Sequence, residues 1–191
     1  MKKKHKLVFG PLALGLCAVP TYEGLAAFDA FIKIDGVPGE SSDAKHKDEI
    51  EVLSYSWGMA QSGGLLSGWN LKCNKAIDKS SPYLYVCSAG GSNLTSGTLS
   101  LRYPGGTNQV EYLTIKMENL IITSVQGGGA ATDTAYRPQE SITFNFQKIE
   151  WTYQPVTTDG APSGPPIVTS WSTPTMPTGA ASSDTTEVSP K

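Results

Sequence analysis

Charged residues are scarce in this 191-residue chain: they make up 17% of the sequence, and the formal net charge at pH 7 is -2. After the first six residues, the chain contains no run of Lys and Arg. Nucleic-acid binding needs clustered cations that displace counterions from phosphates, so we expect no DNA or RNA partner. The length suits one domain of ordinary size with a core of its own.

Histidine and cysteine are also rare, with two and three residues respectively. His46 lies between Lys45 and Lys47, and two neighbouring cations oppose protonation of an imidazole. The sequence therefore predicts a solvated loop here, instead of a general base or a metal ligand. One histidine in the domain and no Cys-x-x-Cys spacing cannot supply the usual zinc sites. We expect no catalytic set, no metal and no cofactor.

The pair Cys73 and Cys87 has two interpretations. In an oxidising compartment, a disulfide would close a loop of about fifteen residues and contribute ~3 kcal/mol in the chain-entropy model. In the cytosol, the two would be small core residues. We favour two buried thiols.

Apolar residues alternate with polar ones over residues 110–117 and 142–153, as the two-residue period of a β-strand requires. The apolar phase flips between Val52 and Leu53 and again near residues 147–148, which predicts a bulge that bends each strand. Long, kinked strands favour a barrel over a flat sandwich. The predicted fold is therefore mainly β, a β-barrel of two sheets with one short flanking α-helix. Further strands are predicted at residues 30–34, 69–73, 98–103, 120–125 and 167–171, with a turn at 104–106 and a mobile loop from 127 to 137.

One segment departs from the β pattern. Ser81 offers an N-cap, Pro82 suits the first helical position, and Gly90 lies just past the end. This spacing predicts the short helix.

The two ends of the chain stand apart from the predicted domain, residues 27–171. Residues 1–26 have a Lys-rich start, an uncharged stretch and small residues after it, which is typical of a secretory signal. The alternative is a start codon assigned upstream of the true one. The uncharged stretch is too short to cross a bilayer as a helix. Residues 172–191 contain no aromatic residue, Leu or Ile, and we interpret them as a flexible tail.

Two groups of side chains have both a functional and a structural interpretation. The tryptophans would form a sugar-binding platform, but aromatic residues on the apolar phase of strands are more often core. The acidic residues between Asp35 and Glu51 would supply a glycosidase pair, but the interleaved Lys and Ser favour a solvated loop. The tryptophans are Trp57, Trp69, Trp151 and Trp171.

Five stretches carry a resemblance to a known family. They are FDAFIKIDGVPGESSDAKHKDEIEVLSYSWGMAQ (28–61), IDKSSPYLYVCSAG (77–90), NQVEYLTIKMENLIITSV (108–125), ESITFNFQKIEWTYQP (140–155) and DGAPSGPPIVTSW (159–171). In this order they are similar to the haemolysin co-regulated protein (Hcp) family, the tube subunit of bacterial type VI secretion. They cover nearly the whole predicted domain.

The resemblance implies a non-enzymatic structural protein whose β-barrel assembles as a hexameric ring. Rings would stack into a tube that a contracting sheath propels from the cell, with effectors carried in the lumen. The implied partners are further copies of the chain and the sheath, spike and effector proteins, with no stable membrane insertion. Export would follow cytoplasmic assembly.

The ends of the chain exceed the family pattern, which starts near Ala27 and ends near Trp171. This favours a mis-assigned start for residues 1–26. A genuine signal would instead make the protein periplasmic or extracellular and put its tube role in doubt. The signal-like start and the tryptophans keep an alternative open, a secreted β-sandwich adhesin or glycan-binding module.

Two sets of residues are candidates for assembly. Ser54 and Ser56 lie on the phase opposite Tyr55 and Trp57, and we hypothesise that they face the lumen. The polar, Gly-rich loop from Gly36 to Asp48 is a candidate for ring-to-ring contact, as is the shorter segment 61–67. The loop candidates are Gly36, Gly39, Glu40, Ser41, Asp43 and His46.

Overall fold

The computed structural model describes residues 28–62, 65–103, 109–130, 137–158 and 160–173. Within them, nine strands form one antiparallel sheet beside a single helix. The predicted signal-like segment, the turn at 104–106 and the tail after residue 173 lie outside the described residues. The elements are β1 (Asp29–Ile34), β2 (Ile50–Glu51), β3 (Ser54–Ser62), β4 (Leu65–Ala76), α1 (Ser81–Gly90), β5 (Asn93–Arg102), β6 (Glu111–Gly128), β7 (Gln139–Asn145), β8 (Lys148–Tyr153) and β9 (Ile167–Ser172).

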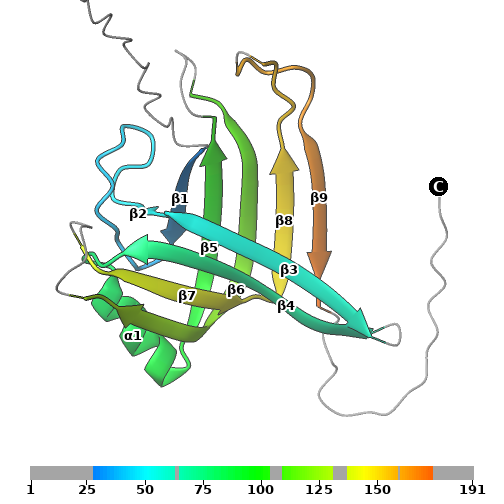
Figure 1. Ribbon diagram of the computed structural model, residues 1–191. Helices are drawn as coiled ribbons and strands as arrows, with labels where there is room; N and C mark the ends of the chain where they lie inside the picture. The colour runs from blue at the N-terminus through cyan, green and yellow to red at the C-terminus, as the bar shows by residue number, and fades with distance from the viewer. Residues whose placement is uncertain (1–27, 63–64, 104–108, 131–136, 159, 174–191) are drawn as a thin grey trace, which may run out of the picture.

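The sheet divides into two branches at β6. The first half of this long strand, residues 113–118, pairs with β8, and residues 121–128 pair with β7. The first branch is β2, β1, β5, the first half of β6, β8 and β9; the second branch is β3, β4, β7 and the second half of β6. In Figure 1 the strands of the second branch cross steeply in front of the first.

A break between β7 and β8 produces the division. Phe146 and Gln147 separate these strands, and the Gln147 backbone N–H donates to the Glu118 carbonyl at 3.1 Å. Opposite the break, Asn119 has a left-handed φ of 53°, a conformation that asparagine tolerates better than most residues. The flip of apolar phase near residues 147–148 therefore marks a real change in the structure, but the predicted bulge within one strand was wrong, because β7 ends at Asn145 and a separate strand, β8, begins at Lys148.

The second predicted phase change also marks a break. The Val52 N–H donates to the Ala30 carbonyl of β1, and the Leu53 N–H donates to the Asn74 carbonyl of β4. The chain thus leaves the first branch at β2 and joins the second at β3. The hydrogen-bonded strand order is open, with β2 and β3 at its ends, where the sequence predicted a closed barrel.

The core lies between the two branches. The alternate residues of β1, β5 and β6 in the first branch and of β4 and β7 in the second point into it, and their side chains are buried. Each large aliphatic or aromatic side chain buried in this way contributes about 1.5–3 kcal/mol. Central members are Ile32, Leu71, Leu99, Ile115, Ile142 and Phe144.

Several predicted boundaries were wrong. β4 and β5 begin four and five residues earlier than the sequence indicated, and Gly127 and Gly128 belong to β6. Pairing with β3 and with β6 extends β4 and β5 beyond the alternating segments that the sequence indicated. Ser172 belongs to β9, and the Thr173 N–H donates to the Gln147 carbonyl, so order continues past the predicted domain end.

The helix starts one residue earlier than the cap predicts. Ser80 is the N-cap, and Ser81, predicted for that role, is the first helical residue. The Ser81 hydroxyl donates instead to the buried Glu140 carboxylate at 2.6 Å. At the other end, Gly91 caps the helix in a left-handed conformation that favours glycine.

Lys75 holds the helix to the sheet. Its ammonium, 1% exposed, donates to Glu140 Oε1 at 2.7 Å and to Asp78 Oδ1 at 2.8 Å. The Ala76 carbonyl and the Ser81 hydroxyl also accept from it. These groups come from β4, β7 and α1, so one cation joins three elements.

No helix in the described part of the chain has the length and apolar character to cross a membrane.

Lys75→Met should lower the free energy of unfolding by about 3–5 kcal/mol, because it leaves two carboxylates in a buried site without their cation. Urea unfolding at fixed protein concentration measures this loss. Lys72→Met, three residues away on the exposed face of β4, is the matched control and should change stability by less than about 0.5 kcal/mol. Equal effects of the two substitutions would contradict the assigned role of Lys75.

Candidate functional site

The loop between β1 and β2 folds as a small hairpin against the first branch. The Gly39 N–H donates to the Asp48 carbonyl at 2.7 Å, and the Ser41 N–H donates to the Glu49 carbonyl at 3.0 Å. A Cβ on Gly39 would overlap the Glu49 carbonyl, so glycine is required there. Of the predicted contact residues, Gly36 and Glu40 are exposed, whereas Gly39, Ser41 and His46 are buried.

His46 is 4% exposed, so the predicted solvated position was wrong. Its ring stacks on Phe31 with centroids 4.2 Å apart. Its Nδ1 lies 2.9 Å from Glu49 Oε2, and its Nε2 lies 3.6 Å from Glu111 Oε1. Phe31 points away from the main core on β1, and the imidazole covers that apolar ring while Lys45 and Lys47 stay in solvent.

Arg102 anchors the tip of the loop. Its guanidinium donates to Asp43 Oδ2 at 2.7 Å and to Asp29 Oδ2 at 2.8 Å, and it lies 5.2 Å from the centre of the Phe31 ring. Asp43 also accepts from the backbone N–H groups of residues 45 and 46. Desolvation raises the pKa of Asp43, but these hydrogen bonds outweigh it and leave the pKa below its ordinary value.

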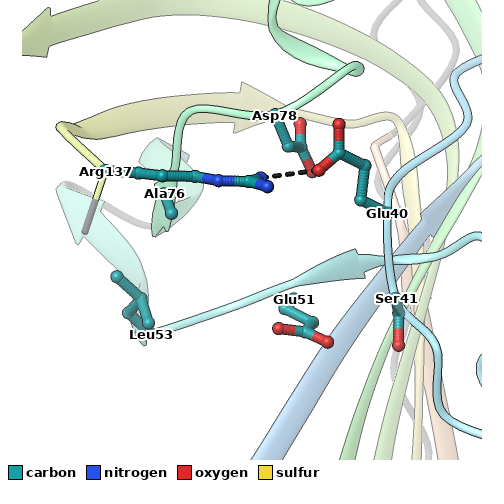
Figure 2. Close-up of a pocket in the computed structure, with 7 residues that line it drawn as sticks. All are labelled: Glu40, Ser41, Glu51, Leu53, Ala76, Asp78 and Arg137. Carbon is teal, nitrogen blue, oxygen red and sulfur yellow. Dashed lines mark hydrogen bonds and ion pairs between the residues drawn. The ribbon is translucent and has the colours of Figure 1, made fainter.

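A pocket of about 260 Å³ lies where the loop meets β2, the end of β4 and the residues just before β3 and β7. Figure 2 shows the Arg137–Glu40 ion pair, 2.6 Å long, along one side, with Glu51 and Leu53 apart from it on the other. The hydrogen bond from Arg137 is the main reason that the pKa of Glu40 is lowered. The lining is Glu40, Ser41, Glu51, Leu53, Ala76, Asp78 and Arg137. The Ser41 hydroxyl accepts from the Asp43 N–H at 3.2 Å and makes no hydrogen bond to a carboxylate among the described residues, so the pocket suits the docking of a side chain more than catalysis.

The second branch has a face of small polar side chains. Ser54 and Ser56 are exposed there, and the Asn74 amide donates to the Ser54 hydroxyl at 2.7 Å. Lys72 is paired in register with Ser56 and is the one charged member of this polar face, within the described residues. The polar face comprises Ser54, Ser56, Asn70, Lys72, Asn74, Thr143 and Asn145, whereas the Ser141 hydroxyl on the same side of the sheet is buried.

Comparison with protein families gives the chain its identity. The family model described as "Type VI secretion system effector, Hcp" matches residues 31–153, more than half of the sequence. The chain belongs to the Hcp family. Protein hcp1 of Pseudomonas aeruginosa is 40% identical over 155 residues, covering 76% of this chain and 94% of the relative.

Solved structures agree with this Hcp assignment. The crystal structure of Hcp1 from Salmonella typhimurium is 33% identical, with a TM-score of 0.65, and covers 76% of this chain and 94% of its own. A type VI secretion system effector from Yersinia pestis is 36% identical, with a TM-score of 0.62, and covers 76% and 100%. The predicted family is therefore confirmed, as is its non-enzymatic role in type VI secretion. The adhesin alternative finds no support.

The burial of the two cysteines and of Trp57 tests two further predictions. Cys73 and Cys87 are free thiols; Cys73 is buried, which raises its pKa to about 12, and Cys87 is half-buried. Trp57 is 46% exposed, so its predicted place in the core was wrong. It lies on β3, which has a neighbouring strand on one side only within the described residues, and its ring centroid is 5.5 Å from that of Trp151.

Removal of the Asp43 charge should lower the stability of this Hcp chain by an amount that depends on pH. Asp43→Asn should lower the free energy of unfolding by about 2 kcal/mol at pH 7, because Arg102 loses a charged hydrogen-bond partner. A carboxyl whose folded pKa is lowered stabilises above its unfolded pKa, near 3.9, and loses this effect as pH falls through the folded pKa.

Urea unfolding between pH 2 and pH 7 checks this sign. The difference in free energy of unfolding between wild type and Asp43→Asn should be constant above about pH 5 and should disappear below about pH 3. A gap that widens as pH falls would contradict the assignment. Asp35→Asn is the control, because the Asp35 carboxylate accepts from Ser96 in an exposed position and contacts no cation within the described residues.

Proposed function

We propose that this Hcp chain assembles as hexameric rings, that the rings stack into the secretion tube, and that effectors travel in the lumen. The observation that carries this proposal is a pair of long open sheet edges, apart from the two-residue β2. Among the described residues, β3 pairs only with β4, and β9 pairs only with β8, so each of these edges leaves one side of its backbone without a strand partner. Unpaired edges of this kind are templates for pairing with another chain.

The two edges differ in sequence and belong to different branches. On β9, Ile167 and Val168 are 58% and 54% exposed; on β3, Trp57 and Met59 are 46% and 37% exposed. Contact between two unlike edges is heterologous, and such contacts close into a ring when the rotation between copies permits. This supports a ring more than a two-fold dimer.

The barrel belongs to the same proposal. The two ends of the strand order, β2 and β3, are separated only by Val52 and Leu53, whose N–H groups donate into opposite branches. We treat this kinked segment as one strand that turns a corner. The path from β1 through β2 and β3 to β4 then closes around the core as a two-sheet barrel.

The polar face supplies the lumen wall. Uncharged hydroxyl and amide groups stay hydrated without strong attraction for one cargo, which suits a wall along which effectors must move. Ser54 and Ser56 lie on this face. Sheath, spike and effector proteins are the partners that we propose from family membership, with export after cytoplasmic assembly.

Light scattering on the full chain tests the ring. Wild type should have about six times the 20.3 kDa mass of one chain. Val168→Lys should reduce it to a monomer, because a charge on an edge strand prevents edge pairing. Val86→Lys, at a 72% exposed position on α1, is the matched control and should stay hexameric. A monomeric wild type at high concentration would refute the ring, and a hexameric Val168→Lys would refute the edge contact.

Spin-label distances test which face lines the lumen. In a six-fold ring, the distance between equivalent labels on neighbouring copies equals their distance from the axis. Labels at Ser56→Cys should therefore give a shorter distance by pulsed electron paramagnetic resonance than labels at Lys116→Cys, on the outer face of the first branch. Both variants need Cys17 and Cys87 replaced by Ser. The reverse order of distances would place Ser56 on the outside.

A further inference from the structure

Lys72 is a cation without an acid partner in the middle of the polar face. It lies on β4, which runs between β3 and β7 in the second branch (Figure 1), and it is exposed. Its register partners are Ser56 on β3 and Thr143 on β7. Asn70 and Asn74 are its neighbours on the same side of β4. Within the described residues, the Lys72 ammonium therefore has hydroxyl and amide groups beside it and no carboxylate.

The side of the sheet that carries Lys72 stays uncharged beyond these neighbours. β3 and β4 contain no Asp or Glu. The one acid of β7 is Glu140, which points to the core and pairs with Lys75. On β6, the residues that pair with β7 on the Lys72 side are Ser124 and Gln126. Four adjacent strands thus present a single charge on this side, within the described residues, and that charge is positive.

The lysines of β6 and β8 differ from Lys72 in this respect. On the outer face of the first branch, Lys148 Nζ lies 3.0 Å from Glu118 Oε1, and Lys116 Nζ lies 4.0 Å from the same atom. Their charges are partly compensated by this shared carboxylate. Lys72 has no such compensation, so its full charge acts on a molecule that lies in front of the polar face.

The proposed ring repeats this charge six times. Ser56 belongs to the proposed lumen wall, and Lys72 is its register partner on the same side of the sheet. Six Lys72 ammonium groups then face the axis at one height, and we call them the Lys72 band. Charges of one sign that line a cavity attract molecules of the opposite sign and disfavour molecules of the same sign.

We propose that the Lys72 band selects cargo by charge, and that the effectors it holds present an acidic surface or an acidic segment to the lumen wall. This inference rests on the proposed ring and lumen, and it adds the chemistry of the cargo. One exposed contact between a lysine and a carboxylate is weak, but six on one circle act on the same cargo together. Because each contact is weak, the cargo leaves without a conformational change of the wall.

The chain's own tail is the competing occupant of the Lys72 band. Residues 174–191 contain two acids, Asp184 and Glu187. They follow Thr173, whose N–H donates to the Gln147 carbonyl at 2.8 Å, two residues beyond Asn145 of the polar face. Docking of these acids on Lys72 would leave the band neutralised before any cargo arrives, so the experiment must detect it.

Peptide binding to rings of the full chain tests the charge preference. The probes are three peptides of equal length in which Glu, Lys or Ser alternates with Gly, each with the same uncharged dye, and fluorescence anisotropy measures binding. At about 0.1 M salt, the rings should bind the Glu peptide about tenfold more tightly than the Ser peptide. The preference should disappear at about 1 M salt, where the Debye length is about 3 Å. Equal binding of the Glu and Ser peptides at the lower salt concentration would overturn the proposal.

Substitutions at position 72 make the test specific. Lys72→Gln should weaken binding of the Glu peptide about tenfold, and Lys72→Arg should retain it. Lys72→Glu should reverse the preference, so that the Lys peptide binds instead, a result that a folding defect cannot imitate. Lys116→Gln is the matched control: it changes the net charge equally on the outer face and should bind the Glu peptide as wild type does. Equal losses in Lys72→Gln and Lys116→Gln, or no loss in Lys72→Gln, would contradict the assignment.

Carbodiimide coupling locates the bound peptide, because it joins a carboxylate to an ammonium group only when the two touch. Mass spectrometry should find the Glu peptide linked to Lys72. Links to other lysines alone would overturn the proposal. Without peptide, a link from Lys72 to Asp184 or Glu187 would identify the tail as the occupant, and it would equally overturn the proposal.

Light scattering and the spin-label distances distinguish a wrong ring from a wrong cargo preference. Each variant must first show the six-fold mass, and a monomeric wild type would refute the ring and the Lys72 band together. Six-fold rings in which labels at position 56 lie farther apart than those at position 116 would keep the ring but place Lys72 outside the lumen. Six-fold rings with position 56 inside and no preference for the Glu peptide would refute the selection by charge alone.

Discussion

The sharing of β6 between two branches is the constraint on which the rest of the structure depends. Every backbone N–H and C=O in a buried strand must be hydrogen-bonded, so a strand that changes partners along its length forces its neighbours to break and bend. The break falls at Gln147, opposite the left-handed Asn119. Because the sheet bends there, its two branches face each other across one core, and within the described residues the unlike strands β3 and β9, together with the two-residue β2, remain at its edges.

Buried ion pairs fix the positions of the helix and of the loop between β1 and β2, which are not strands of the sheet. Lys75 joins α1 to both β4 and β7, and Arg102 joins the tip of the loop to β1. Buried pairs of this kind add little net stability compared with apolar packing, but loss of one partner is costly. Their effect is on geometry: the helix and the loop each have one position on the sheet, and an interaction surface that includes the loop is presented with a defined shape.

The elements that sequence reasoning found are those set by local pattern. The phase changes at Val52–Leu53 and near Gln147 identified both breaks, and the cap and glycine signals located the helix to within one residue. The exposure of Ser54 and Ser56 also followed from alternation. The burial of His46 did not follow from the sequence, because its flanking lysines indicated an exposed position. His46 is buried because it stacks on the Phe31 ring, which has its place only once β1 has packed.

The sequence by itself determined the family, the β class, the breaks and the polar face of the second branch, because each is written in residues that are neighbours in the chain or alternate along one strand. Only the tertiary structure decided that Glu40, Leu53 and Arg137 line one pocket, that His46 is buried, and that Lys72 has uncharged register partners on both neighbouring strands. Such facts depend on which segments, far apart in the sequence, meet when the two branches close on the core, and no local pattern encodes those distances.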